Sequence, residues 1–267
     1  MEYNHIPRQS LGFFPTPLIE LSRLSKALDG PTIFMKRDDN TGLALGGNKT
    51  RKLEFIMGDA LAQGADCVIT AGAAQSNHCR QTAAAAASLG LDCHLVLGGE
   101  EPEQTSGNLL LDKIFGSHIH WAGANRKGED IPKIVEQLTK QGKKPYVIPY
   151  GGSNELGALA FVEAFKELES QRESMDVLFT HIVFASSSGA TQAGLMLGKK
   201  ILNSPAQIVG INIDKGETDK VLFDQYTVAL ANSTAFLLGA DHQFSETDLI
   251  LNSDYVGEGY GVVGTLE

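Results

Sequence analysis

A lysine shortly after two glycines is the residue of this chain best suited to take part in a chemical reaction. It is Lys49, in the segment Leu45-Gly46-Gly47-Asn48-Lys49-Thr50-Arg51-Lys52-Leu53-Glu54. Helix formers follow it, and the positive end of a helix dipole disfavours an ammonium group, as partial burial does. A lysine whose pKa is lowered in this way can act as a nucleophile and form a Schiff base. The glycines let the backbone approach a flat ligand. The segment therefore predicts a carbonyl-reactive amine where a loop becomes a helix.

Two other interpretations apply to the same segment. Residues 42–50 resemble a phosphate-binding P-loop, but that motif needs glycine directly before the lysine, and Asn48 stands there. A nucleotide-binding P-loop is therefore disfavoured. In the second alternative, Lys49 and Lys52 are solvated lysines at the start of a helix.

Length, composition and charge limit the classes of protein to which this chain can belong. The chain has 267 residues, 42% of them hydrophobic, a formal net charge of -10 and a pI of about 5.2. This length allows one large domain or two smaller ones. There is no basic stripe for a nucleic acid, no basic and apolar leader, and no apolar run long enough for a bilayer. We therefore predict a cytoplasmic protein without nucleic-acid or membrane partners.

The cysteines do not suggest a disulfide framework or a metal site. Cys67, Cys79 and Cys93 are an odd and sparse set. Neither His78-Cys79 nor Cys93-His94 has the usual spacing of zinc ligands, and Cys67 and Cys93 lie in apolar runs. We therefore predict buried, unligated thiols.

Strands and helices alternate along the chain. Continuous apolar strands between amphipathic helices indicate parallel sheets covered on both faces, so the predicted fold class is α/β. The predicted strands are residues 32–35, 67–70, 93–97, 118–121, 146–148, 181–185 and 208–213. The predicted helices are residues 52–63, 77–89, 105–115, 131–141, 155–169 and 191–202.

Polar loops rich in small residues follow three of these strands. They are residues 71–78, 151–154 and 186–191. Ligands of open α/β sheets bind at such carboxyl ends. The third loop, Ser186-Ser187-Ser188-Gly189-Ala190-Thr191, opens a helix and is suited to hold a phosphate. The chain has no G-x-G-x-x-G dinucleotide fingerprint and no G-x-S-x-G nucleophile elbow.

Together these segments resemble one family, the pyridoxal-phosphate (PLP) enzymes of the tryptophan-synthase β fold. Within it, the chain is similar to the branch that contains D-cysteine desulfhydrase and 1-aminocyclopropane-1-carboxylate deaminase. The matching segments occur in family order over nearly the full length. They are Pro15-Thr16-Pro17-Leu18, Lys36-Arg37-Asp38-Asp39, the lysine segment, Ala71-Gly72-Ala73-Ala74-Gln75-Ser76-Asn77-His78, Ile148-Pro149-Tyr150-Gly151-Gly152-Ser153-Asn154 and Gly257-Glu258-Gly259-Tyr260-Gly261.

The resemblance implies a role for each site residue. Lys49 would hold PLP as a Schiff base and then act as the base at the substrate's Cα. Asn77 would bond the 3′-oxygen of the ring, and Ser76 the substrate carboxylate, although helix capping also explains both residues. Tyr260 would face the cofactor or be a packed ring. Lys52 and the serine loop would hold the phosphate, through Ser186, Ser187, Ser188, Gly189, Ala190 and Thr191.

The chain departs from the family pattern in two places. Ser187 and Ala190 stand where the desulfhydrase pattern carries glycine, and their side chains occupy space where backbone would approach phosphate. The sequence also ends at Glu267, before the family's further helix, its tyrosine-bearing loop and its Thr-Gly-Gly segment near the pyridine nitrogen. We therefore expect weak PLP retention and little turnover from the chain as written.

The resemblance also predicts the architecture and the reaction. Two open, twisted, mostly parallel sheets would be covered by helices, with PLP between a smaller domain of residues 51–153 and a larger one of residues 1–50 and 154–267, incomplete at its C-terminus. The predicted activity is a lyase or deaminase acting on a small amino acid in a homodimer, foremost D-cysteine desulfhydrase. 1-Aminocyclopropane-1-carboxylate deaminase, L-cysteate sulfo-lyase and a non-catalytic PLP-fold protein are the alternatives.

Overall fold

The predicted α/β class is confirmed. The computed structural model describes residues 5–125, 127–213 and 220–257 of the chain, in which mostly parallel strands alternate with helices. The strands are β1 (Leu18–Glu20), β2 (Phe34–Lys36), β3 (Cys67–Ala73), β4 (Asp92–Gly98), β5 (His118–Trp121), β6 (Pro145–Val147), β7 (His181–Ser186), β8 (Gln207–Asn212) and β9 (Ile250–Asn252). The helices are α1 (Ser22–Leu28), α2 (Lys49–Ala62), α3 (Asn77–Leu89), α4 (Gly107–Ile114), α5 (Ile131–Lys140), α6 (Glu155–Ser174), α7 (Ala190–Ile201) and α8 (Lys220–Leu237).

The sheet of four strands is parallel throughout and has helices on both faces. Its order is β5-β4-β3-β6, with Cys67 opposite Asp92 and Ala73 opposite Gly98. Successive side chains of a strand point to opposite faces. On β3, Ile69 joins the core under α5, while Val68 joins the core under α2, α3 and α4.

The second parallel sheet has three strands in the order β7-β8-β9. Ile182 and Phe184 of β7 pack against the core of α6, α7 and α8, whereas Val183 between them is 60% exposed. The sequence predicted an apolar strand buried on both faces. The described structure covers one face of β7 closely and leaves the Val183 face open, because the helices that pack on this strand lie on the side of Phe184.

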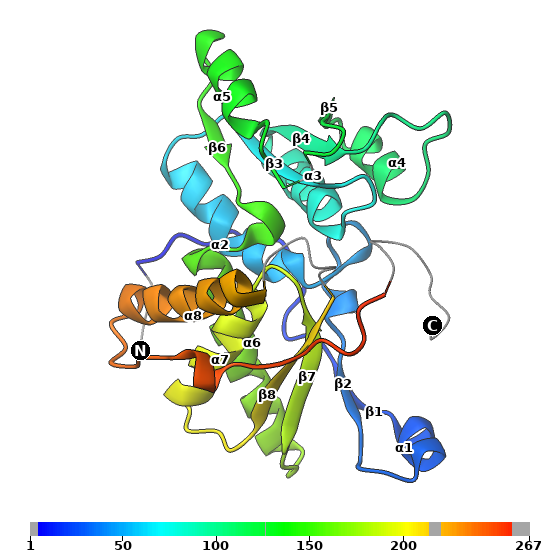
Figure 1. Ribbon diagram of the computed structural model, residues 1–267, viewed down its shortest axis with the longest axis vertical. Coiled ribbons are helices and arrows are strands. Elements are labelled where there is room, and N and C mark those ends of the chain that lie inside the picture. The colour runs from blue at the N-terminus through cyan, green and yellow to red at the C-terminus, as the bar shows by residue number, and fades with distance from the viewer. Residues whose placement is uncertain (1–4, 126, 214–219, 258–267) are drawn as a thin grey trace.

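Helix α2 joins the two sheets into one molecule. In Figure 1 it lies between the four-stranded sheet with its helices and the lower group of α6, α7 and α8. Its Leu53 and Ile56 belong to the core of the four-stranded sheet, and its Phe55 to the core around α6 and α7. The residue that begins this helix is Lys49. The candidate nucleophile therefore stands at the junction of the two cores.

The predicted elements agree with the structure to within a few residues at most ends, including the strand predicted at residues 32–35, which corresponds to β2. Near the ends of the chain, β1 and α1 had no prediction. The antiparallel pair β1 and β2, with α1 between them, projects from the lower part of Figure 1. Helix α8 and strand β9 also had no prediction. No helix in the described ranges has both the length and the apolar character needed to cross a membrane.

Candidate active site

Lys49 occupies the predicted junction between a glycine loop and a helix. It is the first residue of α2, and its Nζ donates a hydrogen bond to Asn48 Oδ1 at 3.2 Å. Burial lowers the pKa of Lys49 to about 8. At neutral pH a larger share of this amine is therefore unprotonated than in a solvated lysine. An amine with this pKa can act as a nucleophile or as a base.

The two glycines before Lys49 are required by the backbone path. Gly46 and Gly47 have φ values of 73° and 134°, which non-glycine residues rarely adopt. A Cβ on Gly46 would lie 1.9 Å from the carbonyl oxygen of Asp39, and one on Gly47 would lie 2.4 Å from Gln81 Nε2. Neither position can carry a side chain without moving its neighbours. The glycines thus serve tight packing of the loop as well as access to a ligand.

Lys52 lies one helical turn after Lys49 and is almost fully buried. It is 1% exposed, and its Nζ donates to the carbonyl oxygen of Gly151 at 3.1 Å. Burial and the nearby Lys49 hold the pKa of Lys52 well below its usual value. A bound anion would reverse this shift by favouring the ammonium form. The interpretation of Lys52 as a solvated lysine is therefore wrong, and its surroundings are suited to an anionic ligand.

Both lysines line one cavity of about 710 Å³. The walls come from α2, from the loop after β3, from residues 150–151 and from the loop after β7. The cavity continues along β7, where residues of α1, β2 and α6 also line it. Most of the predicted site residues meet here: Lys49, Lys52, Ser76, Asn77, Ser186, Ser187, Ser188, Gly189 and Thr191. Carboxyl ends of parallel strands gather ligand-binding loops in this way.

Ser76 and Asn77 stand at the start of α3. The Oγ of Ser76 accepts a hydrogen bond from the backbone N–H of Cys79 at 3.2 Å, so this side chain caps the helix. The Oδ1 of Asn77 accepts from Asn108 Nδ2 at 2.9 Å and from Arg80 Nη2 at 3.3 Å. Since Oδ1 already serves as an acceptor, the amide nitrogen of Asn77 is the group suited to donate to a ligand oxygen.

The serine loop, residues 186–191, connects β7 to α7, and only one of its residues has a left-handed backbone conformation. Gly189 has a φ of 86°, whereas Ser187 and Ala190 are not among the residues with positive φ. Ala190 is fully buried, belongs to the hydrophobic core and donates its backbone N–H to Ser153 Oγ at 3.0 Å. Its side chain points away from the cavity, among whose lining residues Ala190 is not found. Its methyl group therefore leaves the cavity side of the loop open.

His78 is a cavity residue to which the sequence analysis gave no role. Thr70 Oγ1 donates to the carbonyl oxygen of Ile148 at 2.9 Å and lies 2.9 Å from His78 Nε2. Since the hydroxyl has one proton, Nε2 must carry the hydrogen of the imidazole. Nδ1 is then an acceptor, and it has no hydrogen-bond partner among the described residues.

The charge state of His78 follows from its neighbours. Burial, Lys49 and Lys52 hold the pKa of His78 well below its usual value, so the ring is neutral. A neutral histidine adds no positive charge beside two lysines. His78 directly follows Ser76 and Asn77 in the sequence, but the hydrogen bond that its Nε2 donates to Thr70 Oγ1 becomes visible only in the fold.

The remaining predictions fall outside the cavity. The side chains of Cys67, Cys79 and Cys93 are buried as free thiols. Within the described ranges, no group of three or more histidine, cysteine or acidic side chains is arranged to hold a metal ion. Tyr260 lies outside the described residues.

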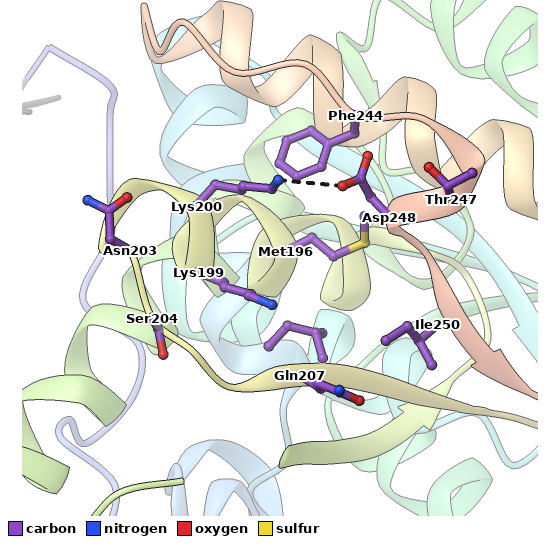
Figure 2. Close-up of a pocket in the computed structure, with 11 residues that line it drawn as sticks. Met196, Lys199, Lys200, Asn203, Ser204, Gln207, Phe244, Thr247, Asp248 and Ile250 are labelled. Carbon is purple, nitrogen blue, oxygen red and sulfur yellow. Dashed lines mark ion pairs between the residues drawn. The ribbon is translucent and has the colours of Figure 1, made fainter. Parts of the chain in front are cut away.

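A second cavity, of about 530 Å³, differs in character from the first. Figure 2 shows it between α7, β8 and the turn that contains Thr247 and Asp248. Lys200 Nζ lies 3.5 Å from Asp248 Oδ1, and the Lys200 side chain is 46% exposed. Its lysines lie at the end of a helix, near solvent, so this cavity lacks a buried amine at a helix start.

Comparisons with known proteins agree with the geometry. The family model for pyridoxal-phosphate dependent enzymes matches residues 9–264. A D-cysteine desulfhydrase of Klebsiella pneumoniae strain 342 is 43% identical over 96% of this chain and 77% of its own length. One from Serratia proteamaculans strain 568 is 44% identical over 86% of this chain and 71% of its own. A crystal structure of an ACC deaminase homologue superposes with a TM-score of 0.84, at 42% identity, over 92% of this chain and 73% of that one.

Proposed function

The chain belongs to the pyridoxal-phosphate dependent enzyme family, and on that premise we propose that it is a lyase that converts D-cysteine and water to pyruvate, sulfide and ammonia. The desulfhydrases at 43% and 44% identity support this substrate. The observation that carries the proposal is the pair Lys49 and Lys52, two lysines of lowered pKa on one face of α2 in one cavity.

The residues of the cavity fit the cofactor. PLP has an aldehyde, a phosphate and a phenolic oxygen. Lys49 supplies an amine for the aldehyde, and the buried Lys52 supplies an ammonium for the phosphate, next to Ser187, Ser188, Gly189 and Thr191. The amide of Asn77 suits the phenolic oxygen. The cavity of about 710 Å³ also has room for a small amino acid beside the cofactor.

The protein's own groups would then perform distinct steps. When bound, PLP withdraws electron density from the substrate's α-carbon. The Lys49 amine, with a pKa of about 8, takes the α-proton, and the β-thiol leaves as hydrosulfide. Ser76 and the first backbone N–H groups of α3 hold the substrate carboxylate, since a helix N-terminus favours an anion. The neutral ring of His78 keeps further positive charge away from the two lysines.

A second substrate has a specific observation in its favour. The solved structure at 42% identity is that of an ACC deaminase homologue. 1-Aminocyclopropane-1-carboxylate is therefore the first alternative to assay. L-Cysteate, whose sulfonate would leave as sulfite, is the second. Both would use the same cofactor, so they are separated by product analysis and not by spectroscopy.

Further features of the protein are proposals from the same premise. We propose a cytoplasmic homodimer, with a smaller domain of residues 51–153 and a larger one that combines residues 1–50 with 154–267. The four-stranded sheet of residues 67–147 and the three-stranded sheet of residues 181–252 support this division. Light scattering at micromolar concentration tests the assembly, and a monomer mass would contradict the dimer.

The activity is tested with the purified chain in the presence of PLP. Sulfide and pyruvate are measured with D-cysteine, L-cysteine, L-cysteate and 1-aminocyclopropane-1-carboxylate at equal concentration. We expect equal molar amounts of sulfide and pyruvate from D-cysteine, and none from a Lys49→Ala variant. Formation of 2-oxobutyrate from the cyclopropane with no sulfide from D-cysteine would replace the proposed substrate by the first alternative.

A further inference from the structure

Two consecutive residues of α3 connect the parts of the proposed site without being part of its wall. Arg80 and Gln81 are 5% and 0% exposed, and neither is among the described residues that line the cavity. From α3, the Arg80 side chain reaches the loop that precedes Lys49, and the Gln81 side chain reaches Thr50, the residue after Lys49. Nothing in the sequence motifs separated them from ordinary core residues of this helix.

Arg80 holds the loop at its least favourable point. Ala44, Leu45 and Gly46 all have positive φ values, of 45°, 69° and 73°. Ala44 and Leu45 are not glycines, so this backbone path needs support from its surroundings. The Leu45 side chain is 79% exposed and contributes little packing. The Arg80 guanidinium donates to the carbonyl oxygens on both sides of Leu45, those of Ala44 and of Gly46, the latter at 3.0 Å.

The same guanidinium also reaches the proposed cofactor-binding amide. Arg80 Nη2 donates to Asn77 Oδ1 at 3.3 Å. One rigid, planar group thus connects the Lys49 loop with the side chain of Asn77. Because Oδ1 accepts from Arg80, the amide nitrogen of Asn77 is turned to the other side, where it can donate.

Gln81 makes a second connection one residue later. Its Oε1 accepts from the backbone N–H of Thr50 at 2.8 Å and from Thr50 Oγ1 at 3.0 Å. Its Nε2 donates to the carbonyl oxygen of Asn77 at 3.0 Å. Gly47 is the residue that permits this reach, since a Cβ there would meet Gln81 Nε2 at 2.4 Å. Gln81 therefore binds the residue after Lys49 to the backbone of Asn77.

We propose that Arg80 and Gln81 are positioning residues that fix the Lys49 amine relative to Ser76 and Asn77. The inference rests on the proposed function, because the relative positions of Lys49, Ser76 and Asn77 matter only if these residues act on one cofactor and substrate. Lys49 lies on α2 and the other two on α3, so their separation depends on what connects the two helix starts. A misplacement of reacting groups by about 1 Å can lower a rate by about 100-fold.

The test compares variants of both residues with a matched control. Arg80→Lys keeps the positive charge but loses the planar guanidinium with its several N–H donors, and Arg80→Gln removes both the charge and the guanidinium. Gln81→Glu keeps the acceptor for Thr50, and Gln81→Met removes acceptor and donor together. The control is Arg172→Lys, because Arg172 is a partly buried arginine that pairs with Glu169 on α6, far along the chain from the site.

Two measurements are made on folded protein. The melting temperature of each variant is recorded as well, to recognise a general loss of stability. The first is the rate at which PLP plus borohydride modifies Lys49, followed by peptide mapping, which requires no substrate. The second is kcat and KM with D-cysteine. We expect Arg80→Gln and Gln81→Met to slow labelling of Lys49 and to lower kcat at least about tenfold, with KM changed less than about threefold. Arg80→Lys and Gln81→Glu should lose less, and Arg172→Lys should label and turn over like the unmodified protein.

The outcomes separate this inference from the proposed function. If the unmodified chain labels Lys49 and the Arg80 and Gln81 variants label it equally fast with unchanged kcat, the positioning role is wrong even if they melt at lower temperature. If the unmodified chain does not label at Lys49, the proposed function itself fails. Normal labelling of all proteins with no turnover of D-cysteine would reject the substrate, and the labelling rates would still decide the positioning role.

Discussion

Among single residues, Lys49 could be predicted from the sequence as a reactive amine because that prediction depends on a local feature. Two glycines, an asparagine and a helix start are contiguous in the chain. His78 and Arg80 could not be identified in this way. The proton on His78 Nε2 is fixed by Thr70 in β3, and the role of Arg80 depends on a loop more than thirty residues earlier. Tertiary contacts of this kind leave no pattern in a single sequence.

The lowered pKa of Lys49 predicts a pH dependence of its reactivity. The unprotonated amine is the reactive form, and it accumulates as pH rises through the pKa. Without PLP, we expect modification of Lys49 by pyridoxal and cyanoborohydride to increase with a midpoint near pH 8. Lys140 in the same sample is the control, since its side chain is 72% exposed. Equal midpoints for the two lysines would show that burial does not tune Lys49.

Ser76 caps α3, and its proposed contact with the substrate carboxylate can be tested separately from this cap by comparing two variants. Ser76→Ala removes the cap of α3 and the proposed contact with substrate carboxylate. We expect KM for D-cysteine to rise about tenfold, equivalent to about 1.4 kcal/mol, while the absorbance of bound PLP is retained. Asn154→Ala is the matched control, because Asn154 caps α6 through Gly157 N at 2.9 Å and does not line the cavity. Both variants should lose about 1 kcal/mol of stability. Loss of PLP from Ser76→Ala would assign that residue to the cofactor instead.

At the scale of elements, the sequence predicted best where local signals agree. Helix α3 has the predicted bounds because Ser76 caps its start and Gly90, with a φ of 70°, ends it. The strands β1 and β9 have three residues each, too few for a period of two to be visible. Helix α8 was missed because apolar residues are spread around it, including the exposed Tyr226 and Phe236, so the sequence shows no clear polar face.

Helix α4 contains a buried carboxyl group that makes stability depend on pH. Asp112 is 0% exposed, and neither of its carboxylate oxygens has a hydrogen-bond partner among the described residues. Burial raises the pKa of Asp112 to about 7, against a smaller opposing effect of Arg80. Between about pH 4 and 7 the carboxyl group of Asp112 is ionised in the unfolded chain but protonated in the folded protein. The free energy of unfolding therefore falls as pH rises through this range.

The Asp112→Asn variant removes that dependence. It should be more stable than the unmodified protein by about 2–4 kcal/mol at pH 8, and the gain should vanish near pH 4. Chemical denaturation at both pH values measures the difference. Glu136→Gln, at a side chain that is 65% exposed, provides the control and should change stability little at either pH. A gain of the same size at pH 4 and pH 8 would mean that ionisation of Asp112 is not responsible.

At the scale of the whole molecule, the sequence indicated the fold class but not what holds α2 in place. Thr16, Lys36, Asp38, Arg51 and Glu167 form a cluster that joins the N-terminal segment to α2 and α6. Arg51 donates to both carboxylate oxygens of Glu167, at 2.8 and 3.0 Å, and to Asp38 at 2.8 Å. These residues are separated by up to 151 positions in the chain. A network of this sequence separation becomes visible only in three dimensions, although the segment containing Lys36 and Asp38 was part of the motif.

Glu167 gives this network a measurable pH dependence. Burial would raise the pKa of Glu167, but hydrogen bonds from Arg51 and Lys36 outweigh it and lower the pKa to about 2. The stabilisation is therefore present above about pH 4.3, the value for the unfolded chain, and is lost as pH falls toward 2. Glu167→Gln should cost about 3–5 kcal/mol at pH 7, since it removes one of the two carboxylates that pair with Arg51 and also the carboxylate that pairs with Lys36, and less at pH 2. Glu173→Gln, at a 69% exposed side chain, should cost little. A Glu167→Gln cost that is the same at pH 7 and pH 2 would contradict this linkage.

Peptide mapping after borohydride reduction shows whether Lys49 is the amine that holds PLP. The chain is incubated with PLP, reduced, digested and analysed by mass spectrometry, with Lys49→Ala processed in parallel. We expect a pyridoxyl phosphate group on Lys49, and its absence from every lysine of the variant at the same PLP concentration. Modification of Lys52 or of another lysine in the unmodified chain, with Lys49 left unmodified, would show that Lys49 does not hold PLP.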